Sequence, residues 1–127
     1  MNYFDAMGHL NGTFDPDSGT FHDESGHLLG RLNLNSGQVF DSSGHLVATI
    51  DHDGNVFDDD HHLVSRYNDH THSFHDAYGN LSGHFDPFSM SFHDGMGHMI
   101  GSVHPTTPAE IHDHYSAIRA HLLDQIL

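Results

Sequence analysis

Histidine is the residue with which this sequence could do chemistry, since 17 of its 127 residues are histidine and 18 are Asp or Glu. Neutral imidazole is the commonest protein ligand for transition metals, and histidine titrates near pH ~6.5. The absence of cysteine excludes thiolate metal sites, disulfides and thiol catalysis. The composition therefore indicates either metal binding through ring nitrogens or a net charge that responds to pH.

These histidines belong to a six-fold internal repeat with spacings of 18, 18, 17, 18 and 18 residues. Every repeat contains an Asp, and a Gly follows three residues later except in the fourth repeat, where His61 replaces it. Asp-x-x-Gly is typical of a tight turn, because Asp bonds its own backbone and Gly supplies a positive φ. We therefore expect an all-β chain: six hairpins in an antiparallel meander of about twelve short strands, closed or nearly closed into a barrel or rosette. The repeats begin at Asn2, Thr20, Gln38, Asn55, Ser73 and Ser91.

The repeated unit, aromatic-Asp-x-x-Gly-His-Leu-x-Gly, resembles the tyrosine-aspartate hairpin repeats of Rhs-type shells. It also resembles the Tyr-Asp-x-x-Gly repeats of small bacterial β-flower proteins. The resemblance covers residues 2–104 and implies a shallow closed barrel of hairpins. The period of 18 residues fits the small β-flower type better than a large shell. This sequence places His after the Gly, so the resemblance implies no ligand or activity.

Alternation along the strands predicts which residues form the core. If Asp5 opposes Gly8 across the turn, then Phe4 opposes His9 and Tyr3 opposes Leu10. The same register in every hairpin gives an inward face with one small residue per repeat. Its three apolar rows are Tyr3, Phe21, Val39, Val56, Phe74 and Phe92; Leu10, Leu28, Leu46, Leu63, Leu81 and Met99; and Phe14, Leu32, Ile50, Tyr67, Phe85 and Val103.

The opposite face carries the candidate metal ligands. The predicted register places His22 beside His27 and His93 beside His98, and directly opposed Cβ atoms lie about 4.5–5.5 Å apart. Two such imidazoles can share Zn²⁺, Ni²⁺ or Cu²⁺, with Asp23 and Asp94 as acceptors for the rings. The alternative is a solvated face of stacked rings. The predicted ligands are His22, His27, His75, His93, His98 and His104, the last four forming the densest group.

The repeats end near residue 104, so we expect a hairpin domain over 1–104 followed by a linker and helix over 105–127. Thr107, Pro108 and Glu110 predict a helix start with a capping box, and apolar residues at helical spacing predict an amphipathic helix over 108–127. This helix packs on the sheet, plugs an open barrel end, or joins a second chain in a homo-oligomer. Its apolar residues are Ile111, Tyr115, Ile118, Leu122 and Ile126.

The charge and the missing motifs limit the function. With no Lys, three Arg and a formal charge of −15, the chain is not expected to bind nucleic acid or anionic lipid. No apolar run predicts a membrane span and no leader is seen, which favours a cytoplasmic protein or one exported without a leader. No nucleophile elbow or phosphate loop indicates an enzyme. The leading prediction is a histidine-rich transition-metal-binding protein for storage, buffering or sensing. The alternatives are a structural or assembly module with pH-dependent self-association, and a module whose glycine-lined interior binds an apolar ligand or a partner helix.

Overall fold

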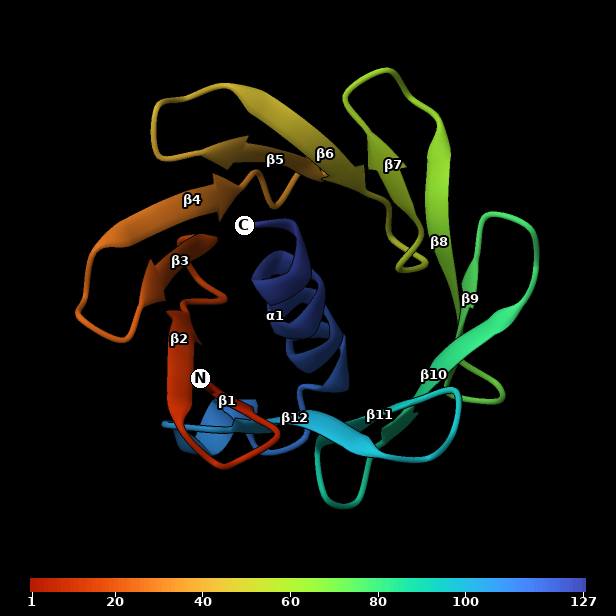
Figure 1. Ribbon diagram of the computed structural model, residues 1–127. Coiled ribbons are helices and arrows are strands. Elements are labelled where there is room, and N and C mark those ends of the chain that lie inside the picture. Colours follow the sequence, from red (N-terminus) through yellow and green to blue (C-terminus); the bar gives the residue numbers. More distant parts are fainter.

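The computed structural model describes all 127 residues as a closed barrel of twelve antiparallel strands around one helix (Figure 1). Strands adjacent in sequence pair with each other, and β1 closes the barrel by pairing with β12. The predicted all-β hairpin meander with one C-terminal helix is therefore confirmed. The strands are β1 (Asn2–Asp5), β2 (Leu10–Phe14), β3 (Thr20–Asp23), β4 (Leu28–Leu32), β5 (Gln38–Asp41), β6 (Leu46–Ile50), β7 (Val56–Asp58), β8 (Leu63–Asn68), β9 (Ser73–Asp76), β10 (Leu81–Asp86), β11 (Ser91–Asp94) and β12 (Met99–His104).

An aspartate side chain holds the turn of every repeat. In the first, Asp5 Oδ1 accepts hydrogen bonds of 2.9 Å from the backbone N–H groups of Met7 and His9, and equivalent bonds recur in the other five repeats. Gly8 has a φ of 83°, a left-handed conformation that glycine adopts without strain. The predicted turn chemistry is therefore confirmed.

The predicted strand register is wrong. The backbone N–H of Asp5 bonds to the carbonyl of His9, so three residues form the loop and the last is the left-handed glycine. Phe4 consequently faces Leu10, and a bulge then brings Tyr3 opposite residue 12. The same irregularity occurs in all six hairpins.

This register corrects one of the three predicted apolar rows. The row that begins at Tyr3 is buried in all six repeats, and the row that begins at Phe14 is buried except at the half-buried Tyr67. The row from Leu10 to Met99 is exposed or half-buried instead. The bulge residues Leu29 and Val47 pack against the core in its place. The two confirmed rows line the lumen.

The lumen holds α1 (His114–Ile126), which lies inside the ring of strands (Figure 1). Residues 116–123 of this helix are all buried, including Arg119 and His121. The helix is therefore buried on every side rather than along one apolar stripe, which corrects the prediction of an amphipathic helix. The glycine-lined interior predicted for an apolar ligand or a partner helix is thus filled by a segment of the same chain.

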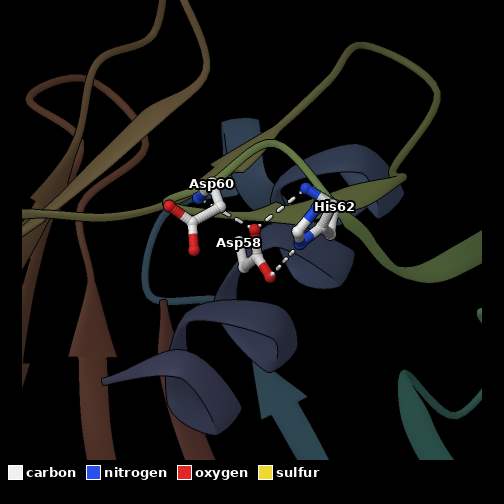
Figure 2. A group of neighbouring side chains, drawn as sticks. All are labelled: Asp58, Asp60 and His62. Carbon is white, nitrogen blue, oxygen red and sulfur yellow. Dashed lines mark hydrogen bonds and ion pairs between the residues drawn. The ribbon is translucent and has the colours of Figure 1, made fainter.

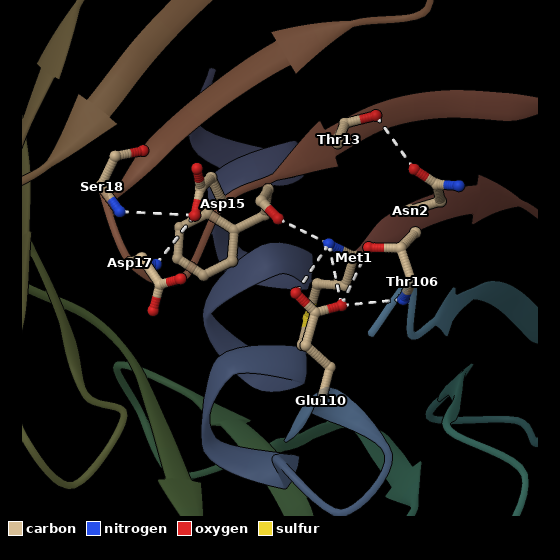
Figure 3. A network of polar contacts seen from close by, with 9 residues as sticks. Met1, Asn2, Thr13, Asp15, Asp17, Ser18, Thr106 and Glu110 are labelled. Carbon is tan, nitrogen blue, oxygen red and sulfur yellow. Dashed lines mark hydrogen bonds and ion pairs between the residues drawn. The ribbon is translucent and has the colours of Figure 1, made fainter. Parts of the chain in front are cut away.

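The helix starts later than predicted because Glu110 has other partners. Its Oε1 accepts a hydrogen bond of 2.8 Å from the backbone N–H of Thr106 and lies 3.3 Å from the amino group of Met1 (Figure 3). Only a short 3₁₀ helix, η1 (Pro108–Glu110), forms here, and Thr107 makes no side-chain cap. The α-helix begins after Asp113, whose carboxylate accepts from the backbone N–H of Ser116 at 3.0 Å.

His121 joins the helix to the barrel wall. Its ring stacks on Phe92 with centroids 4.0 Å apart and planes 7° apart. Its Nδ1 lies 2.6 Å from the hydroxyl of Tyr3, so the two buried polar groups satisfy each other. Burial lowers the pKa of His121 to about 3 and raises that of Tyr3. This imidazole is therefore neutral and has a structural role at neutral pH.

Candidate functional site

The structure does not form the two histidine pairs behind the predicted metal site. His22 and His93 each lie opposite the residue that follows the turn histidine, not opposite the turn histidine itself. The predicted pairing of His22 with His27 and of His93 with His98 is therefore wrong. The cause is the three-residue loop, which moves each turn histidine one position away from its expected partner.

His93 faces His84 across β10 and β11 instead. Both ring nitrogens of His93 have protein partners: Nε2 lies 3.0 Å from Ser91 Oγ, and Nδ1 lies 3.3 Å from the carbonyl of Gly97. A metal at this ring would have to displace one of these hydrogen bonds. His93 is consequently less available as a ligand than its pattern in the sequence predicted.

The two remaining strand histidines lie apart from the turns. His75 is on β9 opposite Arg66, and the exposed His104 ends β12 with its ring 4.6 Å from that of Phe4. The six predicted ligands do not form one group of three or more donor atoms. Metal binding by any one of them stays a prediction.

His27 and His98 belong to a set of five Asp–His pairs at the hairpin tips. In each pair Nδ1 lies 3.5 to 3.7 Å from Oδ2 of the aspartate that caps the turn. A carboxylate beside one ring nitrogen orients the imidazole and leaves the other nitrogen for a metal, as in many histidine metal sites. The pairs are Asp5–His9, Asp23–His27, Asp41–His45, Asp58–His62 and Asp94–His98.

One of these tips gathers three donor groups. Asp58, Asp60 and His62 each place a ligand atom within 4.8 Å of the others at the tip between β7 and β8 (Figure 2). Asp58 Oδ1 accepts the turn's two backbone N–H bonds at 2.9 Å, and its Oδ2 lies 3.6 Å from His62 Nδ1. The turn thus fixes Asp58, while Asp60 and His62 are exposed.

The electrostatics of this tip favour a cation. Hydrogen bonding from the backbone N–H of His62 lowers the pKa of Asp58, so its carboxylate stays ionised. The loop ends on His61 with a φ of 66°, where the other five repeats have glycine. A non-glycine residue in this conformation is strained by about 1–2 kcal/mol. The fourth repeat therefore differs from the others in its backbone as well as its charge.

The sequence contains the signal for this group, because Asp58-Asp-Asp-His-His62 is its densest run of metal-ligating residue types. Alternation predicts which face of a strand a side chain occupies, but it does not apply inside a turn. It therefore does not indicate that Asp58, Asp60 and His62 lie together. Carboxylate and imidazole donors together suit Zn²⁺ and related divalent ions. Three protein donors leave further coordination positions to water.

Comparison with protein-family models, with curated proteins and with solved structures finds no match for this chain. No helix has both the length and the apolar character needed to cross a membrane.

Proposed function

We propose that this chain is a transition-metal-binding protein whose main ion site is the tip formed by Asp58, Asp60 and His62. The observation that supports it is the approach of three ligand atoms to within 4.8 Å of one another. The imidazole favours Zn²⁺, Ni²⁺ or Cu²⁺ over Ca²⁺ and Mg²⁺, which prefer oxygen ligands only.

The exposure of the tip indicates buffering or sensing rather than permanent retention of the ion. Asp60 and His62 are open to solvent, and an ion with only three protein donors keeps exchangeable water ligands. The other four Asp–His pairs have the same capping aspartate but a residue other than Asp in the middle of the turn. We expect them to bind the same ions more weakly.

Replacing Asp60 by serine is expected to weaken binding of the tightest ion by about tenfold or more, because one of three donors is lost. The change gives the tip the Asp–Ser–His composition that the third repeat has at Asp41, Ser43 and His45. Isothermal titration calorimetry with Zn²⁺, Ni²⁺ and Cu²⁺ measures the effect, and His62→Asn should act in the same direction.

His45→Asn is the matched control, since it removes a turn histidine from a tip with two donors. It should leave the affinity of the tightest site unchanged and remove only a weaker binding step from the titration. The proposal is overturned if the unchanged chain binds all three ions no more tightly than millimolar. Equal effects of His45→Asn and His62→Asn would also contradict it.

A self-associating module is the second candidate, and exposed apolar hairpin tips favour it. Met7, Tyr78 and Met96 occupy the same turn position in the first, fifth and sixth repeats and are 82%, 91% and 85% exposed. These hairpins are neighbours around the barrel, because β1 pairs with β12. The other three repeats have a polar residue here. The apolar tips are therefore confined to one arc of the barrel.

Acidification is expected to increase association through this arc. Protonation of exposed histidines moves the net charge from −15 towards zero and so removes repulsion between copies. Light scattering between pH 8 and 5 should show a rising mass, which Tyr78→Ser combined with Met96→Ser should reduce. A mass that is constant with pH excludes this second candidate.

A further inference from the structure

A cavity of about 780 Å³ lies beside α1, away from the hairpin tip formed by Asp58, Asp60 and His62. It is lined by residues of the loop between β6 and β7, of β8 and β9 with the loop between them, of the turn after β9, and of the beginning of α1. This volume is in the range of small-molecule sites. None of Asp58, Asp60 and His62 lines it, so it is independent of the proposed metal site.

The cavity adjoins the loop between β6 and β7, where the third repeat is one residue shorter than the others. At the equivalent position of the other repeats, an inward residue such as Leu32 or Phe85 donates its backbone N–H to a backbone carbonyl of the preceding loop, that of Gly19 or His72. In the fourth repeat, the backbone N–H of Tyr67 lies 3.4 Å from the side-chain oxygen of Asn55. The side chain of Asn55 thus takes the place of the loop carbonyl as the acceptor, and the shortened loop lies beside the cavity.

One of the chain's three arginines lines this space and a second contacts one of its lining residues, and no ion pair in the molecule involves an arginine. Arg66 lines the cavity. Arg119 is 8% exposed, with its guanidinium carbon 3.9 Å from the ring centre of Tyr115, another lining residue. Arg119 donates to the Tyr115 hydroxyl, while its Nε has no hydrogen-bond partner. In a chain with 18 acidic residues, an arginine without a carboxylate partner in a cavity wall indicates an anionic ligand.

The remaining lining groups restrict that ligand further. His52, His72 and His114 offer ring nitrogens, and Asn68 offers an amide. Asp53 and Asp69 also line the cavity, and these carboxylates repel a bare anion. They accept hydrogen bonds from hydroxyl groups, so the cavity suits a molecule that carries both kinds of group.

We propose that this cavity binds a small hydroxylated oxyanion, such as a sugar acid or a sugar phosphate. Arg66 would hold the anionic group, because guanidinium forms paired hydrogen bonds with carboxylate and phosphate. Asp53 and Asp69 would accept hydrogen bonds from the hydroxyl groups of the ligand.

Calorimetric titration of the metal-free full chain with glucuronate, glucose 6-phosphate, glucose and inorganic phosphate tests the proposal. Glucuronate or glucose 6-phosphate should bind at one site, and the preferred one identifies the anionic group. Glucose and inorganic phosphate should each bind at least about tenfold more weakly, since each has only one of the two recognised features.

Arg66→Gln should weaken binding of the preferred anion by about tenfold or more. Arg31→Gln is the matched control, because Arg31 is exposed at the same repeat position on β4 and does not line the cavity. It should leave the affinity unchanged, and both variants should keep the unchanged chain's melting temperature. The proposal is overturned if neither hydroxylated anion binds saturably, if inorganic phosphate or glucose binds equally well, or if Arg66→Gln has no effect.

Discussion

Replacing His121 by phenylalanine is expected to destabilise the chain at pH 8 and, at the same time, to make its stability less dependent on pH. Phenylalanine can keep the stack on Phe92, whose ring centroid lies 4.0 Å from that of His121. It cannot accept the hydrogen bond of Tyr3, whose hydroxyl lies 2.6 Å from His121 Nδ1. A buried hydroxyl left without a partner costs about 1–3 kcal/mol, and the loss should appear in full where histidine is neutral.

The pH dependence follows from the low pKa of His121. Burial lowers the pKa to about 3 in the folded chain, whereas the unfolded chain has the ordinary value near ~6.5. Between these values the unfolded state binds the proton and the folded state does not, so stability falls as pH falls through this range. The contribution of this one group at pH 5 is a loss of about 2 kcal/mol. The variant lacks this loss, so the two stability curves should converge between pH 7 and pH 5.

Urea unfolding of both chains at several pH values from 8 to 5 measures the difference. Tyr3→Phe is the matched control, because it removes the same hydrogen bond and keeps the titrating imidazole; its curve should stay parallel to that of the unchanged chain. Tyr78→Phe, at a residue that is 91% exposed, should change nothing. Parallel curves for His121→Phe and the unchanged chain would contradict the neutral, buried state of His121.

The fold was predictable because the same turn and strand pattern occurs six times in the sequence. Each Asp-x-x-Gly marks a turn, and the residues around it alternate, so an error at one hairpin does not change the topology. Closure followed from the need to pair the edges of β1 and β12. The resemblance to β-flower proteins stays a prediction.

The register was not predictable from alternation alone. A two-residue and a three-residue loop both satisfy Asp-x-x-Gly, and only the left-handed φ of Gly8 with the bond from Asp5 to His9 decides between them. One residue of difference moves a side chain to the other face of the strand. The same step separated His22 from His27 and thereby removed the predicted metal pair.

The sequence also did not determine where the C-terminal helix packs. Alternation identified the small-residue row of the lumen, but nothing local indicated that α1 would fill it. Glu110 fits a capping box in the sequence, yet its contacts are with Thr106 and the amino group of Met1. Long-range partners of this kind override a local motif.

Gly30→Ala is expected to lower the free energy of unfolding by about 3 kcal/mol, because this glycine lies where the helix end and two strands meet. A Cβ at Gly30 would press directly on the backbone carbonyl of Phe40 in β5. It would also lie 2.8 and 2.9 Å from the two methyl carbons of Leu127. The methyl groups can rotate away, whereas the carbonyl belongs to a neighbouring strand and cannot move without disturbing the barrel. The cost should appear as a fall of roughly 10 °C in Tm.

Ala48 provides the comparison, because it occupies the same repeat position on β6 and is 3% exposed. Ala48→Gly should cost only about 1 kcal/mol, from the greater freedom of glycine in the unfolded chain. Adding Leu127→Ala to Gly30→Ala should recover little stability, since the Phe40 carbonyl remains in place. Substantial recovery would instead show that the helix end limits this position. If Gly30→Ala were as stable as the unchanged chain, β4 and β5 could not lie as closely as the structure has them.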